Sequence, residues 1–161
     1  MRARLDTIDW RILKELQADG SLTNVALAGK AGITPPPCLR RVRALEQAGL
    51  ITGYHATLDE KALGYEITAF ALVGLHNQAE ADLRAFENRV LAWPLVRECF
   101  MLSGEADYML KCVATTLTAF QEFVIRELTA APNVANVKTS LSIRRAKWEP
   151  GVPITGARGE G

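Results

Sequence analysis

The sequence predicts an α+β protein in which an N-terminal three-helix helix-turn-helix domain precedes a ferredoxin-like βαββαβ domain. Two observations lead to this prediction. Apolar residues recur at helical spacing on both sides of Gly32, whereas from Tyr65 onward segments with strand and helix patterns alternate. The chain has 161 residues, 48% hydrophobic and 23% charged, which is a globular composition long enough for two small domains.

The first predicted helix opens at residues 5–9. Asp6 suits the N-cap position, and Asp9 adds negative charge to the first turn, where the helix dipole favours it. Gly20 is expected to end this helix. Its apolar face consists of Ile8, Ile12, Leu13 and Leu16. Because so short a helix needs tertiary packing, we expect it to complete a three-helix core.

Residues 22–51 form the predicted helix-turn-helix. Thr23 is a candidate N-cap for its first helix, and Gly32 can adopt the positive φ that a tight turn requires. We expect the second helix to begin after Pro35, because a residue that precedes proline avoids helical angles. Gly49 is expected to stop it.

The second helix has two faces of opposite character when residues are placed roughly 100° apart. The apolar face consists of Cys38, Val42 and Leu45, and the opposite face of Arg40, Arg43 and Gln47, with Arg41 at its shoulder. Between Lys30 and Arg43 there are four basic residues and no acidic ones. An apolar stripe backed by a basic stripe is typical of a DNA-reading helix. The alternative is an ordinary helical hairpin with a solvated arginine face.

Charge is distributed unevenly along the chain. The net charge is only +1, but residues 1–58 carry eight Lys or Arg against five Asp or Glu, a net of +3. The remainder carries eleven against thirteen, a net of −2. A basic first domain on a slightly acidic body suits a DNA-binding domain attached to a domain with another task.

The second half of the chain alternates strand and helix patterns. Expected are strands at 65–75, 95–102 and 106–113, helices at 79–92 and 117–130, and a last strand through Val137, Thr139, Leu141 and Ile143. This order places both helices on one face of an antiparallel sheet. A second copy is the simplest cover for the other face, so we expect at least a dimer.

We place the domains at residues 1–60, with a linking strand near 50–58, and at 61–148. Residues 149–161 are rich in glycine and proline and are expected to form a flexible tail. The chain has neither an apolar run long enough to cross a membrane nor a signal-peptide core, so a cytoplasmic protein without membrane partners is expected. 

No cofactor or metal is expected. The three cysteines lack C-x-x-C spacing and the two histidines are isolated. Nor does the sequence contain a plausible nucleophile-base pair or a phosphate loop, so we do not expect an enzyme.

Five motifs occur in order along the chain: L-D-x-x-D at 5–9, I-L-x-x-L at 12–16, P-C-L-R-R-V-R-x-L-E at 37–46, G-L-I-x-G-Y at 49–54 and S-G-E-x-D-Y at 103–108. Through them the sequence, from Leu5 to Lys147, resembles the Lrp/AsnC family of leucine-responsive or feast–famine transcription regulators. The Pro-Cys-Leu start of the second helix looks closest to the Lrp branch. The resemblance implies binding to double-stranded DNA, assembly of the ferredoxin-like domain into dimers and often octamers, and an amino-acid effector between subunits.

The resemblance places the helix-turn-helix at about residues 24–43. The DNA-binding residues expected from it and from the helix pattern are Asn24, Thr34, Pro35, Pro36, Leu39, Arg40, Arg41, Arg43 and Gln47. The sequence departs from the family at Ala26, where glutamate is frequent, and at Pro36, where Thr or Ser is frequent. Base preference therefore does not carry over from the family.

The resemblance also places the effector near the glycine-acidic hairpin. The expected effector-binding residues are Met101, Gly104, Glu105, Asp107 and Tyr108, and the expected effector is a small amino acid such as leucine or another apolar one. Carboxylates at Asp107 and Glu105 suit an ammonium, and free N–H groups near Gly104 suit a carboxylate. The alternative is that these are ordinary turn residues and that Asp107 braces the hairpin.

The favoured interpretation is a sequence-specific transcription regulator that responds to a small amino acid. An architectural DNA-binding protein without an effector is the first alternative, and a free-standing amino-acid-sensing module or an enzyme is the second. The basic helix-turn-helix argues against the second alternative, because neither a sensor nor an enzyme needs it.

Overall fold

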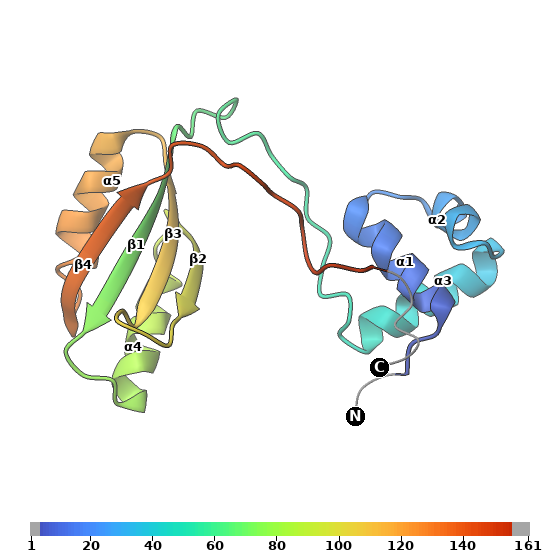
Figure 1. Ribbon diagram of the computed structural model, residues 1–161, viewed down its shortest axis with the longest axis horizontal. Helices are drawn as coiled ribbons and strands as arrows, with labels where there is room; N and C mark the ends of the chain where they lie inside the picture. Colours follow the sequence, from blue (N-terminus) through green and yellow to red (C-terminus); the bar gives the residue numbers. More distant parts are fainter. Residues whose placement is uncertain (1–3, 156–161) are drawn as a thin grey trace. The chain divides into compact units, whose positions relative to one another are not determined.

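The structure is a computed structural model that describes residues 4–155 (Figure 1). These residues divide into two compact units. The first unit contains the residues up to Thr57 together with those from Lys147 onward, and the second runs from Leu58 to Ala146. No helix in the described part of the chain has the length and apolar character needed to span a membrane.

Three helices form the first unit: α1 (Thr7–Ala18), α2 (Asn24–Ala31) and α3 (Pro35–Gln47) (Figure 1). The predicted cap of α1 is confirmed as a capping box. Asp6 accepts the backbone N–H groups of Ile8 and Asp9, and the Asp9 carboxylate accepts the Asp6 N–H. The helix ends at Ala18, slightly before the glycine that was expected to stop it.

The turn between α2 and α3 also follows the prediction. The Thr23 hydroxyl accepts the N–H of Ala26 at 3.2 Å and so caps α2. Gly32 closes the helix with φ of 76°, in the left-handed region that a side chain disfavours. 

The prediction that α3 begins after Pro35 was wrong, because Pro35 already occupies the first helical position. Thr34 is extended, with ψ of 156°, and satisfies the restriction on the residue before a proline. Within the first turn, N–H groups lack intrahelical partners anyway, so three prolines with helical φ are tolerated there. 

The core of the first unit is apolar and draws on all three helices. Its buried members are Ile12, Leu27, Ala28, Ala31, Cys38 and Leu45. Val42 is partly buried against them, so the predicted apolar face of α3 is confirmed. The Lys30 ammonium lies 2.8 Å from the Glu15 carboxylate and also connects α2 to α1.

The linking segment does not form the expected strand. Residues 52–58 have no ladder partner among the described residues, and an isolated strand leaves its N–H and C=O groups unpaired. The predicted turn that follows is present. Tyr65 N–H donates to the Glu60 carbonyl at 2.8 Å, and Gly64 has a positive φ of 83°.

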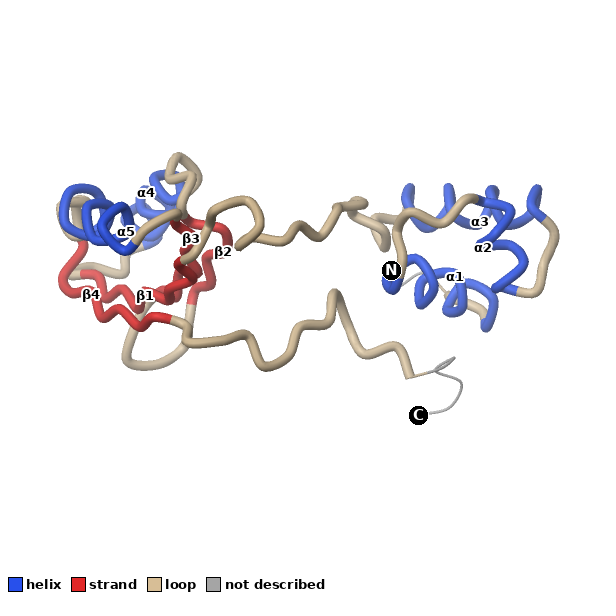
Figure 2. The backbone as a smooth tube through the Cα atoms, turned by 90° about the horizontal axis from the view of Figure 1, so that it is seen from above, coloured by secondary structure: helices blue, strands red, loops and turns tan. Residues whose placement is uncertain are grey.

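The second unit has the predicted βαββαβ order. Its elements are β1 (Ile67–Leu75), α4 (Glu80–Val90), β2 (Val96–Met101), β3 (Tyr108–Ala114), α5 (Leu117–Phe123) with its continuation η1 (Val124–Leu128), and β4 (Val134–Leu141). The antiparallel sheet has the order β2-β3-β1-β4. Both helices cover the same face of this sheet (Figure 2).

The helix-facing side of the sheet forms the core of this unit. Ala69, Ala71 and Val73 of β1 and Leu110 and Cys112 of β3 are fully buried there. Their helical partners are Leu83, Phe86, Val90, Phe120, Phe123 and Leu128. The continuation η1 is a π-helix, which was not predicted: Thr129 N–H donates to the Val124 carbonyl five residues earlier at 2.9 Å.

No helix of the described residues 4–155 covers the other side of the sheet. Leu72 and Phe100 both lie beside Met109 in the ladder, and these two residues are 37% and 46% exposed. Together with Phe70 these residues form an apolar surface that we call the open sheet face. The predicted last strand stops at Leu141, so Ile143 lies beyond it and is 99% exposed.

Part of the expected flexible tail contacts α1. The side-chain amide of Gln17 in α1 donates to the Val152 carbonyl at 2.6 Å and accepts the Val152 N–H at 3.0 Å. The segment through Thr155 therefore belongs to the first unit. The rest of the predicted tail, residues 156–161, lies outside the described residues.

Candidate nucleic-acid interface and ligand-binding hairpin

The face of α3 that points away from the helical core forms a shallow hollow of about 360 Å³. It is lined by Pro36, Leu39, Arg40, Arg43, Ala44 and Gln47. These positions recur every three or four residues and so lie on one side of the helix. We call this surface the α3 face.

Five of the residues predicted to bind DNA therefore meet on the α3 face, and Thr34 is exposed at its N-terminal end. Arg40 and Arg43 form no ion pair with any described residue, so both charges are available to a ligand. The prediction missed Ala44. Its spacing of four from Arg40 was the available signal, and its small side chain lets a partner approach the helix closely.

Asn24 and Pro35, both predicted to bind DNA, are joined to each other by a hydrogen bond. The Asn24 amide donates to the Pro35 carbonyl at 2.8 Å, and both residues are half-buried. This bond joins the first turn of α2 to the first turn of α3. One N–H of the Asn24 side-chain amide is thus engaged within the domain.

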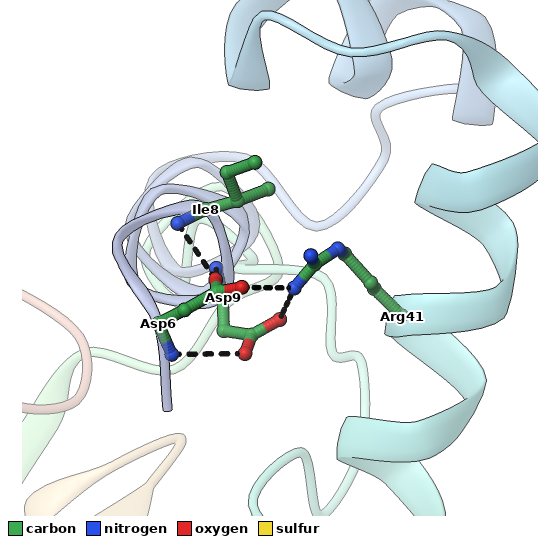
Figure 3. A network of polar contacts seen from close by, with 4 residues as sticks. All are labelled: Asp6, Ile8, Asp9 and Arg41. Atoms are coloured by element: carbon green, nitrogen blue, oxygen red, sulfur yellow. Dashed lines mark hydrogen bonds and ion pairs between the residues drawn. The ribbon is translucent and has the colours of Figure 1, made fainter. Parts of the chain in front are cut away.

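Arg41 turns toward α1 and not toward the α3 face (Figure 3). Its guanidinium donates to Asp6 at 2.8 Å and to Asp9 at 2.7 Å. The pKa of Asp6 is lowered by the hydrogen bond from the Asp9 backbone N–H and further by Arg41. The same two carboxylates raise the pKa of Arg41, with the hydrogen bond to Asp9 as the largest cause.

A further polar contact attaches the linking segment to α3. The Tyr54 hydroxyl donates to the Glu46 carboxylate at 2.9 Å. Partial burial, together with this hydrogen bond, raises the pKa of Tyr54 to about 12. This hydrogen bond attaches the start of the linking segment to the end of α3.

The predicted effector hairpin joins β2 to β3. The Leu102 N–H donates to the Asp107 carbonyl at 2.8 Å and closes the loop. Gly104 and Glu105 are exposed at its tip, and Met101 at its base is 58% exposed. A side-chain carbon built on Gly104 would meet nothing within 4 Å, so the tip is open to a ligand.

Asp107 holds the hairpin against β1. Its carboxylate accepts the Leu75 N–H at 2.6 Å, and its own N–H donates to the Val73 carbonyl at 2.9 Å. The alternative in which Asp107 braces the hairpin therefore has specific contacts. The second carboxylate oxygen makes no hydrogen bond to any described residue and remains an acceptor for a ligand.

Tyr108, also predicted to bind the effector, is buried against α4. It is 1% exposed, and its ring packs against Phe86 with centroids 4.8 Å apart. Its hydroxyl donates to Glu87 of α4 at 3.0 Å, and burial raises its pKa. Tyr108 lies on the same side of β3 as the buried Leu110 and Cys112, and this period-two pattern marks the core side.

A helix-turn-helix with a free basic face, followed by a ferredoxin-like domain with an open hairpin, defines a DNA-binding regulator with a separate ligand domain. Two family models match the chain. One, described as winged helix-turn-helix DNA-binding, matches residues 5–52, and the other, described as Lrp/AsnC ligand binding domain, matches residues 68–152. The chain belongs to the Lrp/AsnC family of transcriptional regulators.

Relatives match along almost the whole chain. A leucine-responsive regulatory protein from Rhizobium meliloti (strain 1021) is 57% identical over 147 residues, covering 91% of this chain and 94% of the relative. The Bkd operon transcriptional regulator of Pseudomonas aeruginosa is 40% identical over 152 residues, covering 94% and 99%. These relatives are regulators and not enzymes.

The fold recurs in a transcriptional regulator from Neisseria meningitidis, whose crystal structure was solved as a complex with L-Met. That structure matches with a TM-score of 0.90 and 35% identity, over 94% of this chain and 98% of the other. The predicted fold class, a helix-turn-helix domain followed by a ferredoxin-like domain, is confirmed by these comparisons.

Proposed function

We propose that this regulator acts in the cytoplasm, binds double-stranded DNA through the α3 face and takes an apolar amino acid, leucine or methionine, as its effector. The observation that carries the proposal is the α3 face itself. Two arginines without acidic partners line a hollow on the helix that follows a glycine turn. That arrangement suits insertion into the major groove.

The two ends of α3 have different tasks in this proposal. The N-terminal residues of a recognition helix reach base edges, which assigns Thr34, Pro36 and Arg40 to base contacts. Arg43 and Gln47 lie further along the helix and contact the phosphate backbone. Three prolines leave the first turn without N–H donors, so phosphate binding depends on the arginines.

The effector site is the hairpin between β2 and β3. Glu105 and the free oxygen of Asp107 accept the ammonium group, and N–H groups near Gly104 donate to the carboxylate. Met101, exposed at the base of the hairpin, contacts the apolar side chain. The L-Met bound to the Neisseria meningitidis relative supports an apolar amino acid as the class of ligand.

Self-association through the open sheet face completes the proposal. An apolar surface on a sheet without a covering helix suits an isologous dimer, and dimers further assemble into an octamer. A ligand bound near such an interface favours one assembly over another. Its effect is limited to its differential affinity for the two forms, typically about 1–3 kcal/mol.

The proposal is tested with the full-length protein and a DNA duplex selected by it from a randomised pool. The twenty amino acids are first screened by thermal shift, and each that stabilises the protein is then added to a binding titration. We expect leucine or methionine to change the DNA affinity. If DNA is bound and no amino acid alters its affinity, the architectural alternative without an effector is favoured.

A further inference from the structure

We propose that Arg41 is a positioning residue that orients the α3 face by joining the middle of α3 to the capped N-terminus of α1. This inference rests on the proposed DNA binding and assigns Arg41 a role other than direct contact. The Arg41 side chain is 30% exposed, and both of its ion pairs go to α1 (Figure 3).

The contact is built into the capping box. One oxygen of Asp6 accepts the N–H groups of Ile8 and Asp9, and the other accepts from Arg41. One oxygen of Asp9 accepts the Asp6 N–H, and the other accepts from Arg41. All four carboxylate oxygens are therefore engaged, and Arg41 is held by groups whose positions are fixed by the start of α1.

The electrostatics argue against a phosphate contact at this position. Two carboxylates lie within 2.8 Å of the Arg41 guanidinium, so the cluster of three side chains carries a net charge of −1. A DNA phosphate is repelled by such a cluster and attracted by Arg40 and Arg43. Arg41 therefore contributes to DNA binding through the orientation of its neighbours.

Orientation matters because the arginines flank Arg41 on the same helix. With side chains, an α-helix has a radius of about 5–6 Å, so a rotation of roughly 10° about its axis moves a side-chain tip by about 1 Å. Binding constellations need their side chains placed to about 0.5 Å, which requires a supporting shell. The Asp6–Asp9–Arg41 cluster supplies that shell for the α3 face.

The test uses three variants of the full chain: Arg41→Met, Asp9→Asn and their combination. DNA affinity is measured by fluorescence anisotropy over a salt series, at a temperature where circular dichroism shows each variant folded. We expect each single variant to lose DNA affinity by about tenfold. The double variant should lose no more affinity than the single variant that binds DNA more weakly. The salt slope should stay unchanged, because no phosphate contact is removed.

The Asp9→Asn variant distinguishes positioning from contact by the sign of its effect. If Arg41 reached a phosphate, removing an acidic competitor would raise DNA affinity, and Arg41→Met would lower the salt slope by about one unit. Either result would overturn the proposal. Lys30→Met is the matched control, because it breaks the other ion pair to α1 without touching α3, and it should bind DNA like wild type.

A second measurement needs no DNA. Residual dipolar couplings report the orientation of α3 relative to α1 within the first unit. They should change in Arg41→Met and Asp9→Asn and stay unchanged in Lys30→Met. Unaltered couplings in the first two variants would refute the positioning role. If the couplings changed but the wild-type protein selected no DNA, the proposed function would fail and the positioning of α3 would stand.

Discussion

Three arginines within four residues of α3 occupy two different environments. Arg41 is paired with two carboxylates, whereas Arg40 and Arg43 face the hollow without an acidic partner among the described residues. Free energy of DNA binding should depend on these differences and not on the number of positive charges. A charge already satisfied within the protein releases no DNA counterion when the complex forms.

Arg40 and Arg43 should fail in different ways when replaced by alanine. Arg40→Ala should cost about 1–3 kcal/mol of binding and relax base preference at one position per half-site. Arg43→Ala should weaken binding to all sequences alike and reduce the salt slope by about one unit. Titrations of matched and mismatched duplexes over a salt series measure both effects. Wild-type affinity in both variants would show that the α3 face is not the interface.

The sequence predicted which residues lie on the exposed face of α3, because helical spacing alone decides which residues lie opposite the apolar stripe. It placed Arg40, Arg43 and Gln47 opposite the core, and the structure exposes all three. The partner of Arg41 was not predictable in the same way. Its position at the shoulder of the helix is compatible with solvent, DNA or another helix, and only the packing of α1 on α3 decides among them.

At the scale of elements, the hairpin between β2 and β3 depends on one carboxylate. Asp107 accepts the Leu75 N–H, so it fixes the hairpin to β1 whether or not it also binds an effector. Two substitutions separate these roles. Asp107→Asn removes the charge but keeps an acceptor oxygen, whereas Asp107→Ala removes both.

We expect the unfolding free energy of Asp107→Asn to stay within about 1 kcal/mol of wild type. Its effector response should fade, because the ammonium loses its anionic partner. Asp107→Ala should lose about 1–3 kcal/mol of unfolding free energy as well, since it leaves the Leu75 N–H without an acceptor. Melting curves and calorimetric titration with the best amino acid measure the two quantities. Undiminished ligand affinity in Asp107→Asn would limit Asp107 to bracing the hairpin.

The order of elements was predicted, and two of their details were missed. Strand and helix periods differ, so the βαββαβ order follows from the sequence. The π-helical segment Val124–Leu128 keeps a helical pattern of apolar residues and has no distinguishing composition. The side on which Tyr108 lies did have a signal, because Tyr108 shares the period-two pattern of Leu110 and Cys112.

At the scale of the whole molecule, the open sheet face should hold two copies together. Leu72 lies on a central strand of that face and is 37% exposed, so an aspartate there is tolerated in a monomer. In a dimer the same charge would be buried without a partner, which is strongly unfavourable. The side chain of Leu91, at the end of α4, is 84% exposed and supplies a matched control away from the sheet.

Light scattering coupled to size exclusion measures the outcome. We expect a dimer or larger assembly for the wild-type protein at micromolar concentration, a monomer for Leu72→Asp, and the wild-type assembly for Leu91→Asp. A compact wild-type monomer would rule out the interface. If Leu72→Asp kept the wild-type assembly, the interface would lie elsewhere on the protein.

At this scale, the C-terminal segment makes a contact that its composition does not predict. Pro150, Gly151 and Pro153 are typical of a loose tail, yet the backbone of Val152 pairs with the side chain of Gln17. The contact joins residues 135 positions apart, and a glutamine on the exposed side of a helix does not identify a backbone partner by its spacing. No local pattern in the sequence contains that information.

Gly151 makes this contact possible and offers the way to test it. Its φ is 72°, and a side-chain carbon built on it would clash with the side-chain amide oxygen of Gln17. Gly151→Ala should therefore release the segment from α1 at a cost of about 1 kcal/mol, and Gln17→Ala should release it by removing both hydrogen bonds. Because the two act on one contact, their effects should not add. Gly29→Ala, at a site with nothing within 4 Å, is the matched control.

Release of the segment is a local opening, so it should appear in hydrogen exchange before it appears in the melting temperature. The Val152 amide should exchange faster in Gly151→Ala and in Gln17→Ala, and at the wild-type rate in Gly29→Ala. The amides of β4 should keep their protection in all three variants, because they pair with β1 in the other unit. Equal exchange at Val152 in the wild-type protein and in Gln17→Ala would mean that the segment is not held by α1 in solution.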